Sequence, residues 1–275
     1  MKLEFHEGEA VAPKDAATIV LVRDHAASPG GATQLEVFCV ERSKQSKFMG
    51  GALVFPGGKV DAGDSDPEWA SLVMGTPDRF AIAAARETLE EACMLHVMNV
   101  DHETLSGLRS DLAKDAGALR AFLRSRSSKL DLSALHLLSR WITPAAETRR
   151  FDARFYVAVA PDGQPGAHDE HETTRSFWAT PAEVLARWQQ GDVQLAPPTH
   201  ATIAGLSTCK TANDVLAWAS RASKEPICPK LVPAGDTMAL VLPGDPEHDV
   251  REQRLDVTWS RYVLRGEKWQ PENAP

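Results

Sequence analysis

Three glutamates that are spaced to share one face of a helix constrain this chain more than any other feature. Glu87, Glu90 and Glu91 belong to the segment 86–94, which reads RETLEEACM. Separations of three and four residues bring side chains together, because successive helix residues turn by about 100°. Like charges so arranged repel one another, and a cation is therefore expected beside them. An acidic helix face exposed to solvent is the alternative interpretation.

A glycine-rich turn ahead of the glutamates favours the metal interpretation. The segment 55–64 reads FPGGKVDAGD and follows a short apolar run, 52–55, that is typical of a strand. A hard divalent cation such as Mg²⁺ takes oxygen ligands and often bridges to substrate phosphates. The turn and the helix together therefore predict a metal site that handles phosphates.

With these residues the chain resembles the Nudix hydrolases. Their box reads Gly, five residues, Glu, seven residues, Arg-Glu, an apolar residue, any residue, Glu-Glu, any residue, Gly and an apolar residue. Gly58 and Asp64 match its opening, with Asp in place of Glu, and the segment 86–91 matches its core. Met94 stands at its last apolar position.

The chain departs from the box at three further places. The segment 65–85 stands where the family has seven residues, Thr88 occupies an apolar position, and Cys93 occupies the final glycine. None of these changes removes a carboxylate that is expected to bind metal. The long insert and Asp64 leave the geometry of the turn open.

Motifs outside the box resemble the coenzyme A diphosphatases of this family. Arg42-Ser43, Gly51 and the FPGG of 55–58 keep the spacing of their signature, and Lys47 stands at the place of its second arginine. Lysine keeps the charge there and loses the bidentate fork of arginine. The insert, the helical stretch after it and three motifs resemble the peroxisomal branch and its bacterial relatives: WITP at 141–144, RRFD at 149–152 and WATP at 178–181.

The resemblance implies that water attacks a diphosphate bond with the help of Mg²⁺ or Mn²⁺, which neutralises charge and lowers the pKa of the water. The metal ligands that it implies are Glu87, Glu90, Glu91 and the backbone carbonyl of Gly58. The carbonyl of Gly57 is the alternative backbone ligand, and Gly57 is otherwise a structural support of the turn. Arg86 is expected to hold a helix carboxylate in place through an ion pair.

The general base is left open. The resemblance allows a box glutamate, Glu87 or Glu91, or a residue of a later loop, for which Glu172 is the candidate ahead of Glu170 and Asp169. A solvated acidic turn is the alternative interpretation of that loop. At least one of four basic side chains is expected to contact substrate phosphates, namely Arg42, Lys47, Arg149 and Arg150.

Short apolar runs alternate with helical patterns, which predicts an α/β (α+β) fold. The resemblance implies a Nudix-type α/β/α sandwich with a mixed sheet over residues 10–206, with the insert 65–85 and a helical subdomain 101–136 inside it. Residues 207–275 are expected to form a C-terminal extension. Strands are predicted at 17–22, 35–40, 52–55, 137–143, 153–159, 238–242 and 255–263. Helices are predicted at 68–74, 78–97, 103–128 with a break at 115–117, 180–190, 201–206 and 213–220.

The composition argues against several partners. Thirty Lys and Arg against 38 Asp and Glu give a net charge of −8, whereas nucleic-acid binding proteins present basic surfaces. No apolar run approaches the roughly 20 residues of a membrane helix, and the acidic N-terminus lacks the apolar core of a signal peptide. A small nucleotide is therefore the expected partner and the cytoplasm the expected compartment, while a homodimer is left open. The four cysteines lack the spacing of a zinc site and are expected as free thiols.

The leading hypothesis is metal-dependent hydrolysis of coenzyme A or an acyl-coenzyme A at its diphosphate bond. Hydrolysis of another dinucleotide, such as ADP-ribose or NADH, is the alternative within the same class. A non-catalytic nucleotide-binding module on the same fold is the alternative from another class. Retention of Glu87, Glu90 and Glu91 argues against such a module, while Asp64 and Cys93 keep it open.

Overall fold

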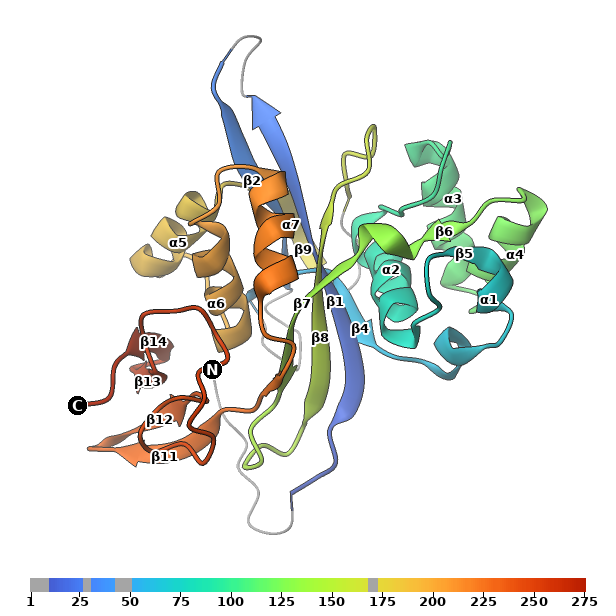
Figure 1. The fold of residues 1–275 in the computed structure, drawn as a ribbon. Coiled ribbons are helices and arrows are strands. Elements are labelled where there is room, and N and C mark those ends of the chain that lie inside the picture. The colour runs from blue at the N-terminus through green and yellow to red at the C-terminus, as the bar shows by residue number, and fades with distance from the viewer. Residues whose placement is uncertain (1–9, 27–30, 43–50, 168–172) are drawn as a thin grey trace.

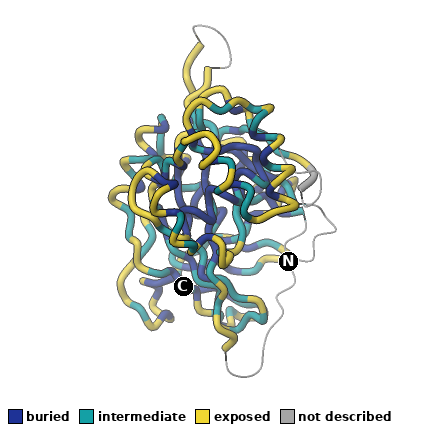
Figure 2. Tube along the Cα trace, turned by 90° about the vertical axis from the view of Figure 1, so that its right-hand side faces the viewer, coloured by how far each residue is buried: buried dark blue, intermediate teal, exposed yellow. Residues whose placement is uncertain are grey.

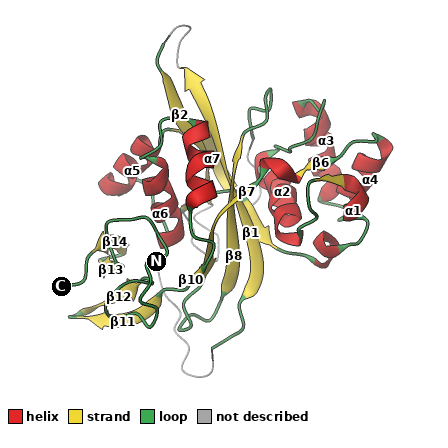
Figure 3. Cartoon of the chain, in the orientation of Figure 1, coloured by secondary structure: helices red, strands yellow, loops and turns green. Residues whose placement is uncertain are grey.

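The computed structural model describes residues 10–26, 31–42, 51–167 and 173–275. Two layers of helices enclose a mixed sheet, and a smaller sheet lies beside one of the layers (Figures 1 and 3). The expected α/β/α sandwich is therefore confirmed. None of the helices in the described ranges is long and apolar enough to cross a membrane.

The mixed sheet has eight strands, with β1 (Lys14–Ala26) in its interior. One edge of β1 runs parallel to β8 (Phe151–Val159), and its other edge pairs first with β4 (Gly57–Lys59) and then with β2 (Thr33–Arg42). The remaining strands are β3 (Leu53–Val54) and β9 (Thr173–Ala179) beside β2, and β7 (His136–Ile142) and β10 (Pro226–Ile227) beyond β8. The first five predicted strands all lie in this sheet.

Residues 19–22 in the middle of β1 are all buried and all apolar, and buried residues fill the centre of the molecule (Figure 2). Ile19 and Leu21 belong to the core on the side of α2 (Arg79–Ala92), while Val20 and Val22 belong to the core on the opposite side. Successive residues of a strand point to opposite faces, so a strand covered on both sides needs apolar side chains throughout.

The second helical layer lies on the face opposite α2 (Figure 1). Its helices are α5 (Pro181–Gln190), α6 (Pro197–Leu206) and α7 (Ala212–Arg221). The start of α5 is confirmed, because Thr180 and Glu183 form a capping box ahead of it. Gly191 ends the helix with a left-handed φ of 85°, a conformation that glycine adopts without strain.

The helix that carries the glutamates ends sooner than predicted. It stops at Ala92 and not near Val97, because Cys93 adopts a left-handed φ of 52°, which terminates a helix. The side chain of Gln164 then accepts from the N–H of Leu95 at 2.8 Å and donates to its carbonyl at 3.0 Å. These backbone groups are thereby satisfied outside a helix.

The insert and the helical subdomain form one unit. Their helices are α1 (Trp69–Leu72), α3 (His102–Leu112) and α4 (Ala118–Ser125), and the break predicted at 115–117 is confirmed. The helix predicted at 68–74 is shorter than expected, since β5 (Val73–Met74) leaves it to pair in parallel with β6 (Leu130–Asp131). Segments separated in the sequence thus share one small sheet.

Residues beyond 206 are divided between the two sheets. Helix α7 and strand β10 lie on the main sandwich. A four-stranded antiparallel sheet follows, made of β11 (Lys230–Ala234), β12 (Thr237–Val241), β13 (Arg261–Arg265) and β14 (Lys268–Glu272). The strand predicted at 255–263 is wrong in its first part. The side-chain amide of Gln253 donates to the carbonyls of Leu255 and Val257 at 2.7 and 2.9 Å, which satisfies them outside a sheet.

Tyr262 of β13 fastens the small sheet to α6. Its ring is 0% exposed, and its hydroxyl donates to the carbonyl oxygen of Pro197 at 3.3 Å. The Nδ1 atom of His200 lies 3.1 Å from the same hydroxyl and is its second partner. Burial lowers the pKa of His200 to about 4, with a further contribution from the charge of Lys268, so this imidazole is neutral near pH 7.

We expect Tyr262→Phe to lower the free energy of unfolding by about 1–2 kcal/mol, because two buried polar groups lose a partner. Urea unfolding followed by circular dichroism measures the change. Ser220→Ala, which removes an exposed hydroxyl on α7, is the control and should stay within about 0.5 kcal/mol. A Tyr262→Phe variant as stable as wild type would contradict the fastening role of this hydroxyl.

Candidate active site

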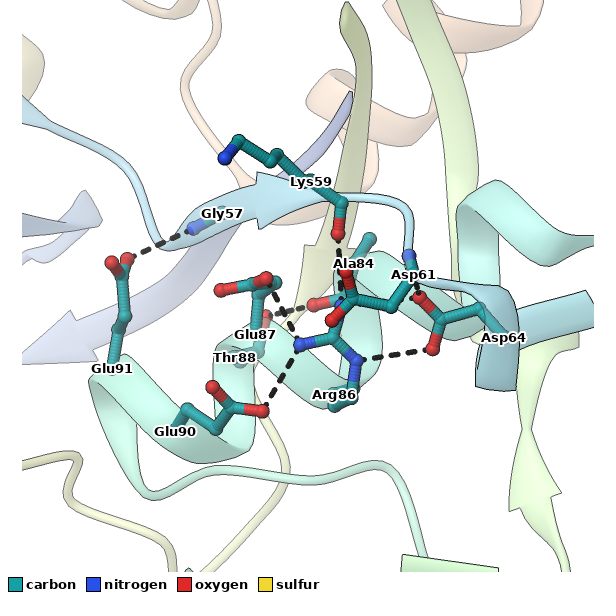
Figure 4. A network of polar contacts seen from close by, with 10 residues as sticks. All are labelled: Gly57, Lys59, Asp61, Asp64, Ala84, Arg86, Glu87, Thr88, Glu90 and Glu91. Carbon is teal, nitrogen blue, oxygen red and sulfur yellow. Dashed lines mark hydrogen bonds and ion pairs between the residues drawn. The ribbon is translucent and has the colours of Figure 1, made fainter. Parts of the chain in front are cut away.

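The strand β4 lies against the face of α2 that carries the glutamates (Figure 4). A Cβ atom on Gly58 would lie 2.4 Å from Oε1 of Glu87. A Cβ atom on Gly57 would lie 2.5 Å from the carbonyl oxygen of Ala17 in β1. Glycine at both positions therefore lets the strand fit between β1 and the helix. Gly58 makes room for a carboxylate, whereas Gly57 makes room for the backbone of β1 and the side chain of Thr18.

The guanidinium of Arg86 lies at the centre of this arrangement (Figure 4). Its Nε and Nη2 donate to the two oxygens of Asp64 at 3.0 and 3.1 Å, and Nη2 also donates to the carbonyl of Lys59 at 2.9 Å. Its Nη1 donates to Oε1 of Glu87 and to Oε1 of Glu90, both at 3.0 Å. Burial alone would lower the pKa of Arg86, but the bond to Asp64 and the neighbouring carboxylates raise it, so the group stays charged.

A short turn, η1 (Ala62–Ser65), brings Asp64 to Arg86. Asp64 is 3% exposed, and its Oδ2 accepts the N–H of Asp61 at 2.8 Å as part of a capping box. The aspartate that replaces the usual box glutamate thus makes a bidentate ion pair with the arginine. This turn was not predicted from the sequence, although two aspartates three residues apart are a signal for it.

The three glutamates do not all face one point. Glu91 is 7% exposed, and its Oε2 accepts the N–H of Gly57 at 3.0 Å, while Glu87 and Glu90 contact Arg86. Among the residues that the structure describes, no three His, Cys, Asp or Glu side chains are grouped closely enough to hold a metal ion. The helix face predicted from the spacing is present, and donors of the protein itself occupy its carboxylates.

The donor set nevertheless suits a hard divalent cation. Oε1 of Glu87 and Oε1 of Glu90 both lie 3.0 Å from one nitrogen of Arg86, so two carboxylates already converge on one positive charge. Carboxylate and carbonyl oxygens are the ligands that Mg²⁺ and Mn²⁺ prefer. The side chain of Glu90 is 38% exposed, which makes this side of the helix accessible from solvent.

Glu87 has the most perturbed carboxyl group of the site. Burial raises its pKa to about 7, the charge of Arg86 opposes this rise, and the charge of Glu90 adds to it. The side chain is only 14% exposed, so water does little to stabilise its charge. Near neutral pH this carboxyl group therefore takes up and releases a proton, unlike an ordinary glutamate.

Part of the predicted site lies outside the described residues, namely Lys47, Asp169, Glu170 and Glu172. Arg42, which ends β2, and Thr173, which begins β9, border these segments and are paired across the two strands. The described parts of β2 and β9 therefore end together at one end of this strand pair.

The two arginines ahead of β8 are placed differently from each other. Arg150 donates from Nε to the carbonyl of Thr143 at 3.1 Å and from Nη1 to the carbonyl of Val11 at 2.7 Å. These bonds join the start of the chain to the connection between β7 and β8. Arg149 is exposed. The geometry thus favours Arg149 over Arg150 as a group with donors available to a ligand.

Two hollows of the described surface lie elsewhere. One is lined by Trp259 and its neighbours in the C-terminal extension, and the other lies between Trp269 and the connection from α5 to α6. Neither is lined by a residue of α2 or β4. The glutamate face is the candidate site because of its chemistry.

Known proteins resemble the chain over most of its length. The family model of the NUDT19 Nudix domain matches residues 13–82 and 73–206. Acyl-coenzyme A diphosphatase NUDT19 from Gallus gallus is 26% identical over 280 residues, which cover 79% of this chain and 74% of that protein. The protein of the same name from Homo sapiens is 26% identical over 274 residues, with 79% and 73% covered. A crystal structure of a Nudix hydrolase from Alicyclobacillus acidocaldarius aligns with a TM-score of 0.64 and 29% identity, over 75% of this chain and 96% of that one.

The raised pKa of Glu87 has a measurable cost. A carboxyl group with a folded pKa of about 7 and an ordinary value of 4.5 destabilises the folded state as the pH rises between these values. Glu87→Gln should therefore raise the free energy of unfolding by roughly 1–3 kcal/mol at pH 8 without metal, and change it little at pH 4.5. Thermal and urea unfolding in the presence of EDTA test this.

Glu252→Gln is the control, since Glu252 is exposed, and its stability should follow wild type at both pH values. A Glu87→Gln variant that is no more stable than wild type at pH 8 would show that the buried carboxylate is not destabilising.

Proposed function

The chain belongs to the Nudix hydrolase family, within the group that the NUDT19 Nudix domain describes, and from this premise we propose its reaction. The reaction is metal-dependent hydrolysis of the diphosphate bond of coenzyme A or an acyl-coenzyme A. Its products are phosphopantetheine, or the acyl form, and adenosine 3′,5′-bisphosphate. The observation that carries this choice of substrate is the likeness to acyl-coenzyme A diphosphatases over 79% of the chain.

We assign the metal to the helix face and the strand beside it. The proposed ligands are Glu87, Glu90, Glu91 and the carbonyl of Gly58. When bound, Mg²⁺ or Mn²⁺ neutralises the oxygens of the diphosphate and lowers the pKa of the attacking water. Arg86 is held by both oxygens of Asp64, and its hydrogen bonds to Glu87 and Glu90 orient these two carboxylates.

A carboxylate has to take the proton of the attacking water. Glu87 and Glu91 of α2 and Glu172 of the later segment are the proposed candidates. A general base must lie within hydrogen-bond reach of the water that it deprotonates, and a carboxylate beside the proposed metal meets this condition. Oε2 of Glu91 accepts the N–H of Gly57, which holds this carboxylate beside β4 and supports its role as a ligand.

The substrate carries phosphates that need basic partners. We propose Arg42 and Lys47, which lie at the end of β2 and in the segment after it. Arg149 is proposed as a further contact because it is exposed. Arg150 ranks behind it, since its donors are engaged by backbone carbonyls.

A panel of diphosphates tests the substrate. Coenzyme A, acetyl-coenzyme A, ADP-ribose and NADH are each incubated with the full chain and Mg²⁺ or Mn²⁺, and the products are separated by chromatography. We expect kcat/KM for the coenzyme A compounds to exceed the others by at least about tenfold, a difference of about 1.4 kcal/mol in transition-state binding. Faster cleavage of ADP-ribose or NADH would defeat this choice, and the absence of any turnover would favour a binding module.

Gly58→Ala tests the arrangement of strand and helix. The added Cβ would lie 2.4 Å from the carboxylate of Glu87 and must displace it, so kcat should fall by roughly 100-fold, as for an ångström-scale misplacement of a catalytic group. The fold should persist, because a flexible side chain moves and not backbone. Gly63→Ala is the matched control, since nothing lies within 4 Å of a Cβ there. Equal kcat for the two variants would remove Glu87 from the site.

A further inference from the structure

Two arginines of α4 form ion pairs with residues just after the turn that carries Asp64. Arg120 forms an ion pair with Asp66, and its Nε lies 3.7 Å from Oε2 of Glu68. Nη1 of Arg124 lies 2.6 Å from Oε1 of Glu68. The helical subdomain therefore contacts the start of the box insert through charged side chains.

Asp66 is joined firmly to the turn. Its N–H donates to the carbonyl of Gly63 at 3.3 Å, and the indole N–H of Trp69 donates to the same carbonyl at 2.9 Å. Trp69 is 4% exposed, so its ring is fixed by the core. Holding Asp66 in place consequently holds the turn that presents Asp64 to Arg86.

Helix α4, which carries both arginines, is itself packed into the core. Leu119 and Leu123 lie in its buried face and are 1% and 0% exposed. Soon after the helix, Leu130 pairs with Val73 of the insert, so the two segments are also joined through their backbones. The subdomain and the insert therefore form one packed body beside the site.

We infer that Arg120 is a positioning residue for the metal-binding glutamates and acts through the Asp64–Arg86 pair. Arg86 divides its donors between Asp64 on one side and Glu87 and Glu90 on the other. If Asp64 is displaced, the guanidinium keeps the carbonyl of Lys59 and the two glutamates as its partners, and it competes more strongly with a divalent cation for those glutamates. This inference rests on the proposed metal dependence.

Arg124 provides a matched control one helical turn further along. The side chain of Arg120 is 19% exposed and that of Arg124 is 59% exposed. An exposed ion pair contributes little, because water and salt screen it and long side chains lose freedom in forming it. Replacing each arginine by methionine removes the charge from a long unbranched side chain, so the two variants differ mainly in the ion pair that they lose.

Titration calorimetry with Mn²⁺ on the full chain measures the effect directly. We expect Arg120→Met to raise the Kd for Mn²⁺ about tenfold, at the low end of what loss of a group behind a metal ligand causes. Arg120→Lys should recover most of this loss, and Arg124→Met should stay within about twofold of wild type. An Arg120→Met variant that is folded by circular dichroism and binds Mn²⁺ like wild type would overturn the inference.

A second measurement separates this inference from the proposed function. If wild type itself binds no Mn²⁺, the proposed metal dependence fails, and unfolding without metal decides the positioning role. Asp64→Asn should then lower the urea midpoint less in the Arg120→Met background than in wild type, because coupled residues are not additive. Equal shifts would overturn the inference. If Arg120→Met does not fold, Asp66→Asn removes the same ion pair and is judged by the same outcomes.

Discussion

One guanidinium joins the parts of the site that the sequence separates. Arg86 binds Asp64 from the turn before the insert, the carbonyl of Lys59 from β4, and two glutamates of its own helix. Arginine suits this position because its planar fork offers five donors in fixed directions, whereas an ammonium group is a compact point charge. A buried charge is costly without partners. The strand, the turn and the helix are therefore positioned together, since each supplies an acceptor for the same group.

The same network does not fully stabilise the charged form of one carboxylate. Glu87 lies beneath Gly58, where the missing Cβ gives it room, and burial raises its pKa to about 7 despite the nearby Arg86. The charged form of Glu87 thus lowers the stability of the fold near neutral pH. Perturbed carboxyl groups of this kind gather at sites where a ligand supplies the missing charge. A divalent cation would supply it here, and the cost in stability is consistent with a site shaped for binding.

Features set by neighbouring residues could be predicted from the sequence, and features set by distant partners could not. The spacing of the glutamates predicted their shared helix face, but it did not predict the hydrogen bond from the N–H of Gly57 to Glu91. Cys93 and Gln164 end α2 early through a left-handed residue and a side chain that lies 69 positions from its partner. Gln253 likewise keeps its neighbours out of a sheet in spite of their apolar alternation. The site residues in 43–50 and 168–172 stay predictions.

The insert 65–85 poses a physical problem that the helical subdomain answers. Lengthening a connection severalfold costs only on the order of 1 kcal/mol in closure entropy, so the insert is tolerable for stability. A long connection nevertheless no longer fixes the direction from which Asp64 meets Arg86, as a short one does. Other contacts must therefore fix the position of Asp64. These contacts are the ion pairs from α4 to Asp66 and Glu68 and the pairing of β5 with β6. We therefore infer that the helical subdomain positions Asp64 against Arg86, because the long insert cannot do so by itself.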